Sequence, residues 1–343
     1  MGKTGKRSDD SATTAVGIHG ARGHMRRRVL SLAPLALTLG SGTAMGQGNW
    51  PSGTIKFICP YPPGGSSDLI TRLIADGVSA GLKHPVVVEN KGGAGGAIGT
   101  QLFVNSPPDG NTFLMGASSA VAISPNLRKL PYDPLTDMVS VAMVSAAYGL
   151  IAARKDLPFN NVHEMAEYAK KNPGKLTFGS AGPATATHIN GEIMHSKLGL
   201  QIRHIPYKGS AASLNDLMGG HIDLIYDAIA LPQAKLGAVK VLAVTSAERH
   251  PELPNVPTLR EQNAPEVSAT WFGLFAPRGT PRAIITRMAA EVEKVVKQPE
   301  TRAQMLKMSQ FPKYEGPDEM AATVRKEYAY FKELFAQLGI KGE

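Results

Sequence analysis

The same local pattern recurs along this chain: a short apolar run, a turn rich in glycine and serine, and then apolar residues at helical spacing. The first instance joins residues 55–58, the turn 62–67 and a helix expected from Asp68. A later instance joins residues 176–178 to the turn 179–187. Strands that alternate with helices are typical of α/β proteins with parallel sheets. We therefore expect parallel α/β sheets, whose ligands lie beyond the carboxyl ends of the strands, where these turns occur.

The remaining strands and helices are expected over most of a chain of 343 residues. Further strands are expected at residues 86–88, 112–115, 202–205, 222–226, 239–245 and 271–275, and helices from residue 281 to the end. Because a typical domain holds about 100–200 residues, this length favours two domains.

The first 46 residues have the order of an export signal. Three arginines at residues 26–28 precede an apolar stretch at 29–37, and the small residues Ala44 and Gly46 follow. This order is typical of a signal peptide, with cleavage expected after Gly46. We therefore expect residues 1–46 to be removed and the mature protein to be periplasmic.

Two features of this segment stay open. Arg26 and Arg27 fit a twin-arginine signal as well as plain Sec export. Translation can start at Met1 or at Met25. Seven of the 37 lysines and arginines fall in residues 1–46, so the formal charge of +9 overstates the basicity of the rest. No run of lysine or arginine elsewhere suggests a nucleic-acid surface.

Neither a metal nor a cofactor is expected. The chain has one cysteine, Cys59, so it offers neither a disulfide nor a thiolate cluster. The histidines of the expected mature chain do not have the spacing of metal ligands; those considered are His163, His195, His204, His221 and His250.

The two turns at residues 64–67 and 179–187 have the composition of anion sites. A helix N-terminus offers unpaired N–H groups and a partial positive charge, so it binds anions without a charged side chain. A carboxylate held by backbone and hydroxyl donors is the natural guess. The alternative is that both are ordinary βα loops, in which Ser66 or Ser67 caps the helix and Asp68 suits its positive end.

Motifs of enzymes and of nucleotide-binding proteins match poorly. The glycines at residues 92–99 do not form G-x-G-x-x-G, because Ile98 stands where the last glycine belongs. The P-loop and the G-x-S-x-G elbow of hydrolases are absent from the sequence. Ser180 and His188 resemble a nucleophile and its base, but His188 is better explained as a helix-start residue that orients the turn. No catalytic residue is assigned, and the chain is not expected to be an enzyme.

An ordered set of motifs over essentially the whole expected mature chain resembles one known family. The motifs are residues 60–68 (PYPPGGSSD), 86–96, 108–110, 130–134, 172–176, 206–209, 242–245, 254–258 and 272–274. In this set the chain resembles the extracytoplasmic receptors of tripartite tricarboxylate transporters, also called the Bug family.

The resemblance implies a type II periplasmic-binding-protein fold, with two α/β lobes, two crossovers and a ligand cleft between the lobes. Lobe 1 is expected at residues 47–147 and 242–343, and lobe 2 at 148–241. The implied function is capture of a small carboxylate by lobe closure and delivery to the membrane subunits of a transporter. The implied receptor acts as a monomer. A ligand-presenting sensor subunit for a membrane kinase and a periplasmic hydrolase are the alternatives.

The resemblance also implies a set of binding residues, carried over by position. In lobe 1 these are Tyr61, Gly64, Gly65, Ser66, Ser67, Asp68, Ser118 and Ser119. In lobe 2 they are Ser180, Ala181, Gly182, Thr185, Thr187 and His188, with Asp227 at the cleft. Two departures from the family pattern, Pro183 and Ala228, leave the identity of the carboxylate open.

The mature protein should begin at or near Gln47, because the basic, apolar and small segments end at Gly46. The intact mass of the periplasmic form checks this expectation. A mature product that retains residues 26–28 would contradict it.

Overall fold

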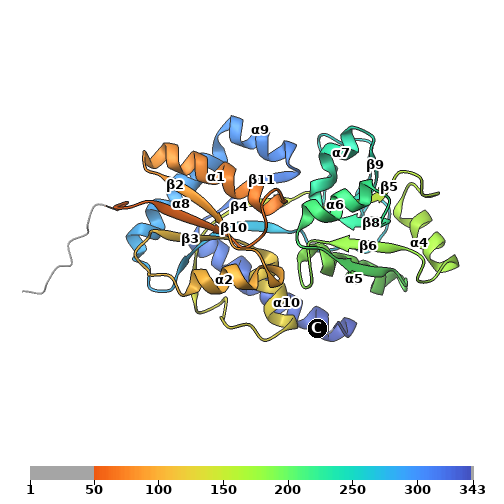
Figure 1. The fold of residues 1–343 in the computed structure, drawn as a ribbon, viewed down its shortest axis with the longest axis horizontal. Helices are drawn as coiled ribbons and strands as arrows, with labels where there is room; N and C mark the ends of the chain where they lie inside the picture. Colours follow the sequence, from red (N-terminus) through yellow and green to blue (C-terminus); the bar gives the residue numbers. More distant parts are fainter. Residues whose placement is uncertain (1–49, 341–343) are drawn as a thin grey trace, which may run out of the picture. The chain divides into compact units, whose positions relative to one another are not determined.

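The computed structural model describes residues 50–340, so the predicted signal peptide lies outside the described residues. The described chain is built on two sheets (Figure 1). The first sheet has six strands in the order β11-β4-β10-β3-β1-β2, and the second has five in the order β7-β6-β8-β5-β9. Among the described residues, no helix combines the length and the apolar character needed to cross a membrane.

The first sheet contains two parallel and three antiparallel strand pairs. β1 lies parallel to β2 and β3, whereas β10 runs antiparallel to β3 and β4, and β11 antiparallel to β4. Its strands are β1 (Ile55–Cys59), β2 (Val86–Asn90), β3 (Thr112–Ala117), β4 (Met138–Ala147), β10 (Trp271–Pro277) and β11 (Gln310–Glu315). The helices between or after them are α1 (Ser66–Leu82), α2 (Ala97–Val104), α3 (Ser124–Leu127), α8 (Arg282–Lys297), α9 (Pro299–Lys307) and α10 (Pro317–Leu338).

The second sheet is also mixed. β6 is parallel to β7 and β8, and β5 is antiparallel to β8 and β9. Its strands are β5 (Leu150–Arg154), β6 (Thr177–Ser180), β7 (Arg203–Pro206), β8 (Leu224–Tyr226) and β9 (Val239–Val244). Its helices are α4 (Val162–Lys171), α5 (Ala186–Leu198), α6 (Ser210–Met218) and α7 (Leu231–Lys235). In Figure 1 these elements lie on the right and those of the first sheet on the left.

The expected parallel pairing is present in both sheets, but both sheets are mixed. Parallel pairing holds only where a strand, a helix and the next strand follow one another in the same sheet. The antiparallel pairs arise where the chain passes between sheets, from β4 to β5 and from β9 to β10. The expected run of helices from residue 281 to the end was wrong, because the edge strand β11 separates α9 from α10.

The predicted lobe boundary between residues 241 and 242 falls inside β9, and this detail needs correction. Ala243 and Val244 pair with β5, so the whole strand belongs to the second sheet. Leu242, Leu259 and Ala264 are buried in the apolar core that packs on that sheet. The chain therefore returns to the first sheet only with β10.

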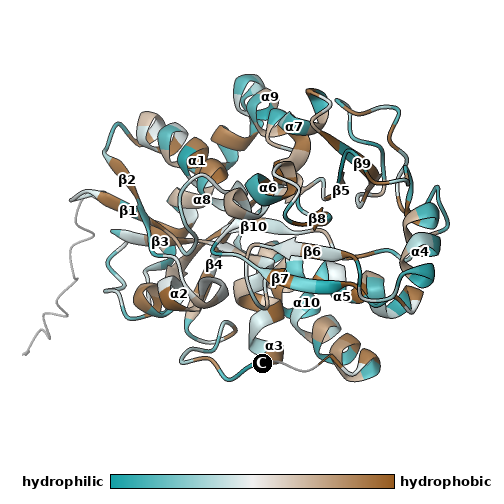
Figure 2. Cartoon of the chain, turned by 45° about the vertical axis from the view of Figure 1, so that its right-hand side comes forward, coloured by the Kyte–Doolittle hydropathy of each residue, from teal (hydrophilic) through white to brown (hydrophobic). Residues whose placement is uncertain are grey.

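Each sheet has its own apolar core. In the first, Ile70, Ile74 and Val78 are spaced by four residues, so they lie on one face of α1, where they are buried with Phe57 and Val292. The helices carry hydrophobic and hydrophilic stretches, as the brown and teal segments of α4, α5 and α10 show (Figure 2). Burial of these apolar faces stabilises the layers by about 25 cal/mol per Å² of apolar surface.

Helix α10 is tied to the first sheet by a partly buried acid. The Trp271 indole donates a hydrogen bond of 2.6 Å to Glu327 Oε2. Burial raises the pKa of Glu327 from 4.5 to about 7, although the Trp271 bond and the nearby Lys313 oppose the rise. The folded protein therefore holds a proton on Glu327 over a pH range in which the unfolded chain has lost it.

This linkage gives a prediction for Glu327→Gln, which keeps an oxygen for the Trp271 indole but removes the acid. The stabilising effect of the raised pKa is complete below pH 4.5 and is lost as the pH rises through 7. At pH 8 the variant should therefore be more stable than the wild type, by on the order of 1–3 kcal/mol. At pH 4.5 the difference should be small. Denaturant unfolding at both pH values measures it, with the exposed Glu319→Gln on the same helix as control. Equal shifts in both variants would contradict the prediction.

Candidate ligand-binding pocket

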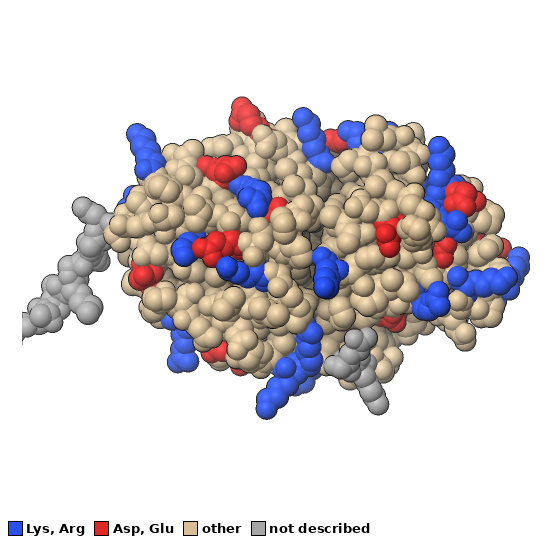
Figure 3. All heavy atoms as spheres, in the orientation of Figure 1, with Lys and Arg blue, Asp and Glu red and all other residues tan. Residues whose placement is uncertain are grey.

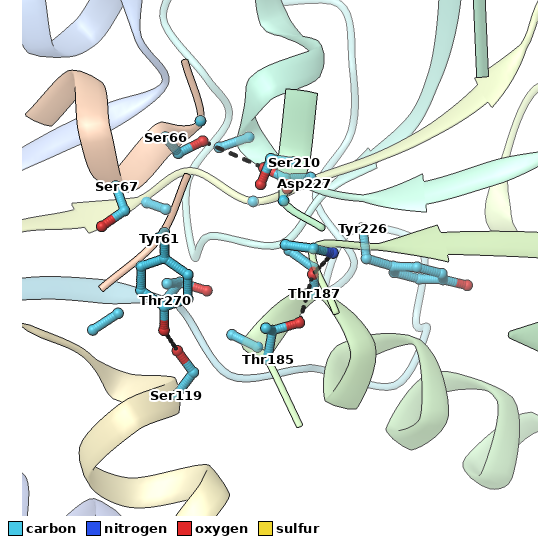
Figure 4. A pocket seen from close by; sticks show the side chains of 18 of the residues that line it. Tyr61, Ser66, Ser67, Ser119, Thr185, Thr187, Ser210, Tyr226, Asp227 and Thr270 are labelled. Carbon is cyan, nitrogen blue, oxygen red and sulfur yellow. Dashed lines mark hydrogen bonds between the residues drawn. The ribbon is translucent and has the colours of Figure 1, made fainter. Parts of the chain in front are cut away.

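A pocket lies where the turns after β1, β6 and β8 meet segments of both crossovers. Tyr61, Ser66 and Ser119 line it from elements of the first sheet (Figure 4). Thr185, Thr187, Ser210 and Asp227 line it from elements of the second. The crossovers between the sheets, from β4 to β5 and from β9 to β10, add Gly149, Thr245 and Thr270, and Ala147 comes from the end of β4. The pocket therefore draws on residues that are far apart in the sequence.

The first turn is held by Asp68 rather than by a serine cap. Gly65 occupies the N-cap position of α1 with no side-chain hydrogen bond, and Ser66 is already the first helical residue. The prediction that Ser66 or Ser67 caps this helix was therefore wrong. The Asp68 carboxylate accepts the Gly64 N–H at 2.9 Å, which satisfies a donor at the positive end of the helix.

The same carboxylate also engages Arg72 and Asn90. Arg72 donates to Asp68 at 3.0–3.1 Å and Asn90 Nδ2 at 2.9 Å. Burial raises the pKa of Asp68, but the bonds from Arg72, Gly64 and Asn90 outweigh it and lower the pKa below 3.8. Asp68 is thus an ionised and fully engaged acid that does not line the pocket. The guanidinium of Arg72 is paired with Asp68.

The second turn is braced by its own hydroxyls. Thr185 is the N-cap of α5 and accepts the His188 N–H at 3.4 Å. Its hydroxyl donates to the Gly182 carbonyl at 2.7 Å. Thr187 Oγ1 accepts the Ala181 N–H at 2.9 Å and lies 3.0 Å from Thr185 Oγ1. These bonds fix the turn and place the start of α5 beside the pocket (Figure 4).

Ser180 and His188 do not form a nucleophile and base. The Ser180 hydroxyl lies 2.7 Å from His204 Nε2 and is buried under the turn. His188 Nδ1 accepts the Ala184 N–H at 3.2 Å, which confirms that His188 orients the turn. The rings of His188 and His204 stack with centroids 3.9 Å apart. Burial, together with the neighbouring His188, lowers the pKa of His204 from 6.5 to about 4.

Asp227 meets the pocket at the carboxyl end of β8. Its Oδ1 accepts the Ile229 N–H at 3.0 Å and the Ser66 hydroxyl at 3.4 Å, so it joins the two sides of the pocket (Figure 4). Burial raises the pKa of Asp227, although the hydrogen bonds from Ile229 and Ser66 and the adjacent Ser210 hydroxyl oppose the rise. The neighbouring Tyr226 ring points away from the pocket, and its hydroxyl lies 2.8 Å from His195 Nε2.

The structure brings most of the predicted site residues to one pocket, while their contact with a ligand stays a prediction. Those that line it are Tyr61, Gly65, Ser66, Ser67, Ser119, Ala181, Thr185, Thr187 and Asp227. Those that do not are Gly64, Asp68, Ser118, Ser180, Gly182 and His188. Gly182 instead lines a neighbouring cavity that also includes the glycines at 92–96. Tyr61 and Lys208 line both cavities.

Sequence reasoning missed several residues of the pocket. They are Asn190, Lys208, Ser210, Thr245, Thr270, Phe272 and Gln310. Lys208 and Ser210 lie in the turn between β7 and α6, so the same strand, turn and helix pattern could have pointed to them. The others come from a helix interior, from strands or from the crossovers, where no local pattern marks a site. Among residues 50–340, no cluster of three or more His, Cys, Asp or Glu side chains is placed to hold a metal ion.

Comparison with known families and structures agrees with this architecture. The family described as "Tripartite tricarboxylate transporter family receptor" matches residues 70–340. The chain belongs to this family. A "UPF0065 protein in tcbD-tcbE intergenic region" of Pseudomonas sp. is 36% identical over 279 residues, 80% of this chain and 83% of the relative. Protein BugT of Bordetella pertussis is 29% identical over 93% of this chain and 99% of its own.

Solved structures of similar proteins give the same result. The periplasmic binding protein BugD has a TM-score of 0.81 and 34% identity, over 86% of this chain and 100% of its own. An R. palustris protein with adipate has a TM-score of 0.82 and 30% identity, over 86% and 100%. MatC from Rhodopseudomonas palustris, with bound malate, has a TM-score of 0.78 and 28% identity, over 82% and 99%. These confirm the predicted periplasmic-binding-protein fold, and the family is one of solute-binding receptors rather than enzymes.

The partly buried His204 predicts how the free energy of unfolding depends on pH. The pKa of His204 is lower in the folded protein than in the unfolded chain. Its contribution to the free energy of unfolding is therefore complete above pH 6.5 and is lost as the pH falls through about 4. His204→Gln keeps a hydrogen-bonding partner for Ser180 and cannot take up this proton. The variant should therefore lose less stability than the wild type between pH 6.5 and pH 4. Thermal unfolding across that range measures the difference, with the exposed His221→Gln as control. Parallel curves for wild type and His204→Gln would contradict the prediction.

Proposed function

We propose that this receptor captures a small carboxylate in the pocket described above and delivers it to the membrane subunits of a tripartite tricarboxylate-type transporter. In this proposal residues 1–46 direct export to the periplasm. The described chain works as two lobes, one built on each sheet. The predicted residues that line the pocket contact the ligand, and those behind it hold the two turns in place.

The observation that carries the proposal is the meeting of two helix N-termini at one pocket. Helix α1 begins at Ser66 and α5 at Ala186, and both residues line the pocket. Each helix start presents backbone N–H groups and the positive end of a helix dipole. An anion placed between them is stabilised from two sides. The adipate and malate of the structural neighbours are both carboxylates of suitable charge.

The charged side chains support a site that relies on neutral donors. Basic and acidic side chains are interspersed over the face shown in Figure 3, with no broad field of one sign. Of the described residues that line the pocket, Lys208 is the one lysine or arginine, and it is exposed. Arg72 is paired with Asp68. Selectivity for an anion therefore rests mainly on backbone dipoles and hydroxyls.

Contacts across the pocket support lobe closure as the capture step. Ser66 donates to Asp227 at 3.4 Å, and the Ser124 hydroxyl donates to the Ala184 carbonyl at 3.1 Å. Each bond joins an element of the first sheet to one of the second. A ligand that adds further bonds to both sides shifts the population toward this arrangement by its differential affinity.

A charge placed at the second turn tests the neutral-donor site. Thr185 is 2% exposed, and both Asp and Asn are good N-caps, so Thr185→Asp and Thr185→Asn retain the start of α5. Thr185→Asp should weaken carboxylate binding by roughly 10³-fold relative to Thr185→Asn, because like charges about 4 Å apart repel by ~4 kcal/mol near a protein surface. Lys208→Gln should cost less than about tenfold, since exposed ion pairs contribute ~0.2–1 kcal/mol.

The measurement is calorimetry with carboxylates chosen by a thermal-shift screen of mono-, di-, tri- and aromatic acids. Circular dichroism confirms that the variants fold. An ion-pair site would give the reverse order, with binding abolished in Lys208→Gln and retained in Thr185→Asp. A screen in which no carboxylate binds would reject the proposed ligand class.

A further inference from the structure

Two acceptor atoms in the wall of the pocket have no donor. The side chain of Asp227 is 5% exposed, and its Oδ2 is buried without a hydrogen-bond partner among residues 50–340. The other oxygen, Oδ1, is already used by Ile229 and Ser66. No lysine, arginine or histidine within the described chain forms an ion pair with this carboxylate.

The second acceptor belongs to Asn190 of α5, which is 6% exposed and lines the same pocket. Its Nδ2 donates to the Ser268 carbonyl at 3.0 Å. Since a carbonyl can only accept, this bond fixes the orientation of the amide and leaves Oδ1 as the free end. Oδ1 is buried and lacks a partner in the described chain.

Unpartnered acceptors in a buried wall are costly, and a carboxylate oxygen is the most costly kind. An ionised Asp227 also repels an anionic ligand that approaches it. A carboxylate without a donor group, bound between the two helix starts, therefore leaves the acceptors of Asp227 and Asn190 unpaired. The same wall becomes favourable when the ligand presents a donor to it, because a charge-assisted hydrogen bond then replaces the missing partner.

We propose that the ligand is a carboxylate that carries a hydrogen-bond donor, a hydroxyl or an ammonium group, and that Asp227 selects for this donor with Asn190 as a second acceptor. This inference rests on the proposed function and narrows it. The carboxylate lies between the starts of α1 and α5, and the donor faces the end of β8. Asp227 is then a determinant of specificity rather than of anion binding as such.

The test compares acids that share a carbon skeleton. Propanoate, succinate, glutarate and benzoate are each titrated by calorimetry beside their hydroxy and amino derivatives. The substituent is on the α carbon of the aliphatic acids and on the ortho carbon of benzoate. In the wild type the tightest ligand should carry the donor and bind at least tenfold better than its plain parent acid, as expected for a hydrogen bond of ~1.5–3 kcal/mol to a charged group. Binding should take up no proton, as judged from the heats in buffers of different ionisation enthalpy.

Asp227→Asn provides the decisive variant, because it retains Oδ1 for the Ile229 N–H and removes the charge. The donor-bearing ligand should lose at least about tenfold in affinity, while the plain acid binds equally well or better. The exposed Asp76→Asn on α1 is the control and should change neither. Circular dichroism and thermal unfolding establish that the variants are folded.

Three results would overturn the inference. In the first, a plain acid binds as well as its derivatives. In the second, Asp227→Asn weakens every acid equally. In the third, a proton is taken up with a plain acid, which would make Asp227 a donor to a second carboxylate. In each of these the proposed function stands, because a carboxylate still binds. If no acid of the panel binds, this inference and the proposed ligand class fail together.

Discussion

The Asp68 carboxylate joins three segments at the edge of the pocket, and the first half of the site depends on it. It accepts the N–H of Gly64 in the turn, pairs with Arg72 one helical turn later, and accepts from Asn90 at the end of β2. Gly64 has a φ of 81°, a conformation that glycine adopts without steric cost. The bond from its N–H to Asp68 secures that conformation. The pairing also engages the Arg72 guanidinium, so backbone dipoles are the main source of positive potential at this turn.

The second half of the site is organised differently. There the hydroxyls of Thr185 and Thr187 are used to brace their own turn, and Ser180 is bound to His204 below it. Residue types that suggest ligand contacts in the sequence thus serve partly as internal supports. Asp227 and Asn190 each keep a buried oxygen without a partner in the described chain, as do Thr245 Oγ1 and Gln310 Nε2 elsewhere in the pocket wall. The distinction matters because a braced turn offers a preorganised site, whereas a free acceptor imposes a requirement on the ligand.

Local sequence patterns predicted much of this arrangement. The strand, turn and helix units from residue 55 onward and from residue 176 onward are present, and both turns reach one pocket. These features are encoded by residues close in the sequence. The strands β4, β5 and β11 were missed because they lie outside such units, and their antiparallel pairing is set by the crossovers.

Individual side chains of the pocket were harder to predict. Gln310 and Thr245 approach it only because the first sheet brings β11 beside β4 and the second crossover follows β9. Asn190 lies inside α5, where a single polar residue normally indicates a solvent-facing position. The cap of α1 was assigned to a serine because serine is a common N-cap, whereas Gly65 and the bond from Gly64 to Asp68 fill that role. A serine cap and the Gly64–Asp68 bond are both possible at this helix start, and tertiary contacts decide which one forms.

The position of α10 limits how the two sheets can move. Its C-terminal half buries Phe331, Leu334 and Phe335 against Ile189 and Ile193 of α5, and against the segment that follows β3. Its middle is fastened to β10 through Glu327 and Trp271, so it travels with the first sheet. Pulling α5 away from α10 would expose this apolar cluster to water, at a cost of about 25 cal/mol per Å². In the proposed lobe motion, this apolar cluster is therefore the place about which the lobes would rotate, because rotation keeps the cluster buried whereas separation exposes it.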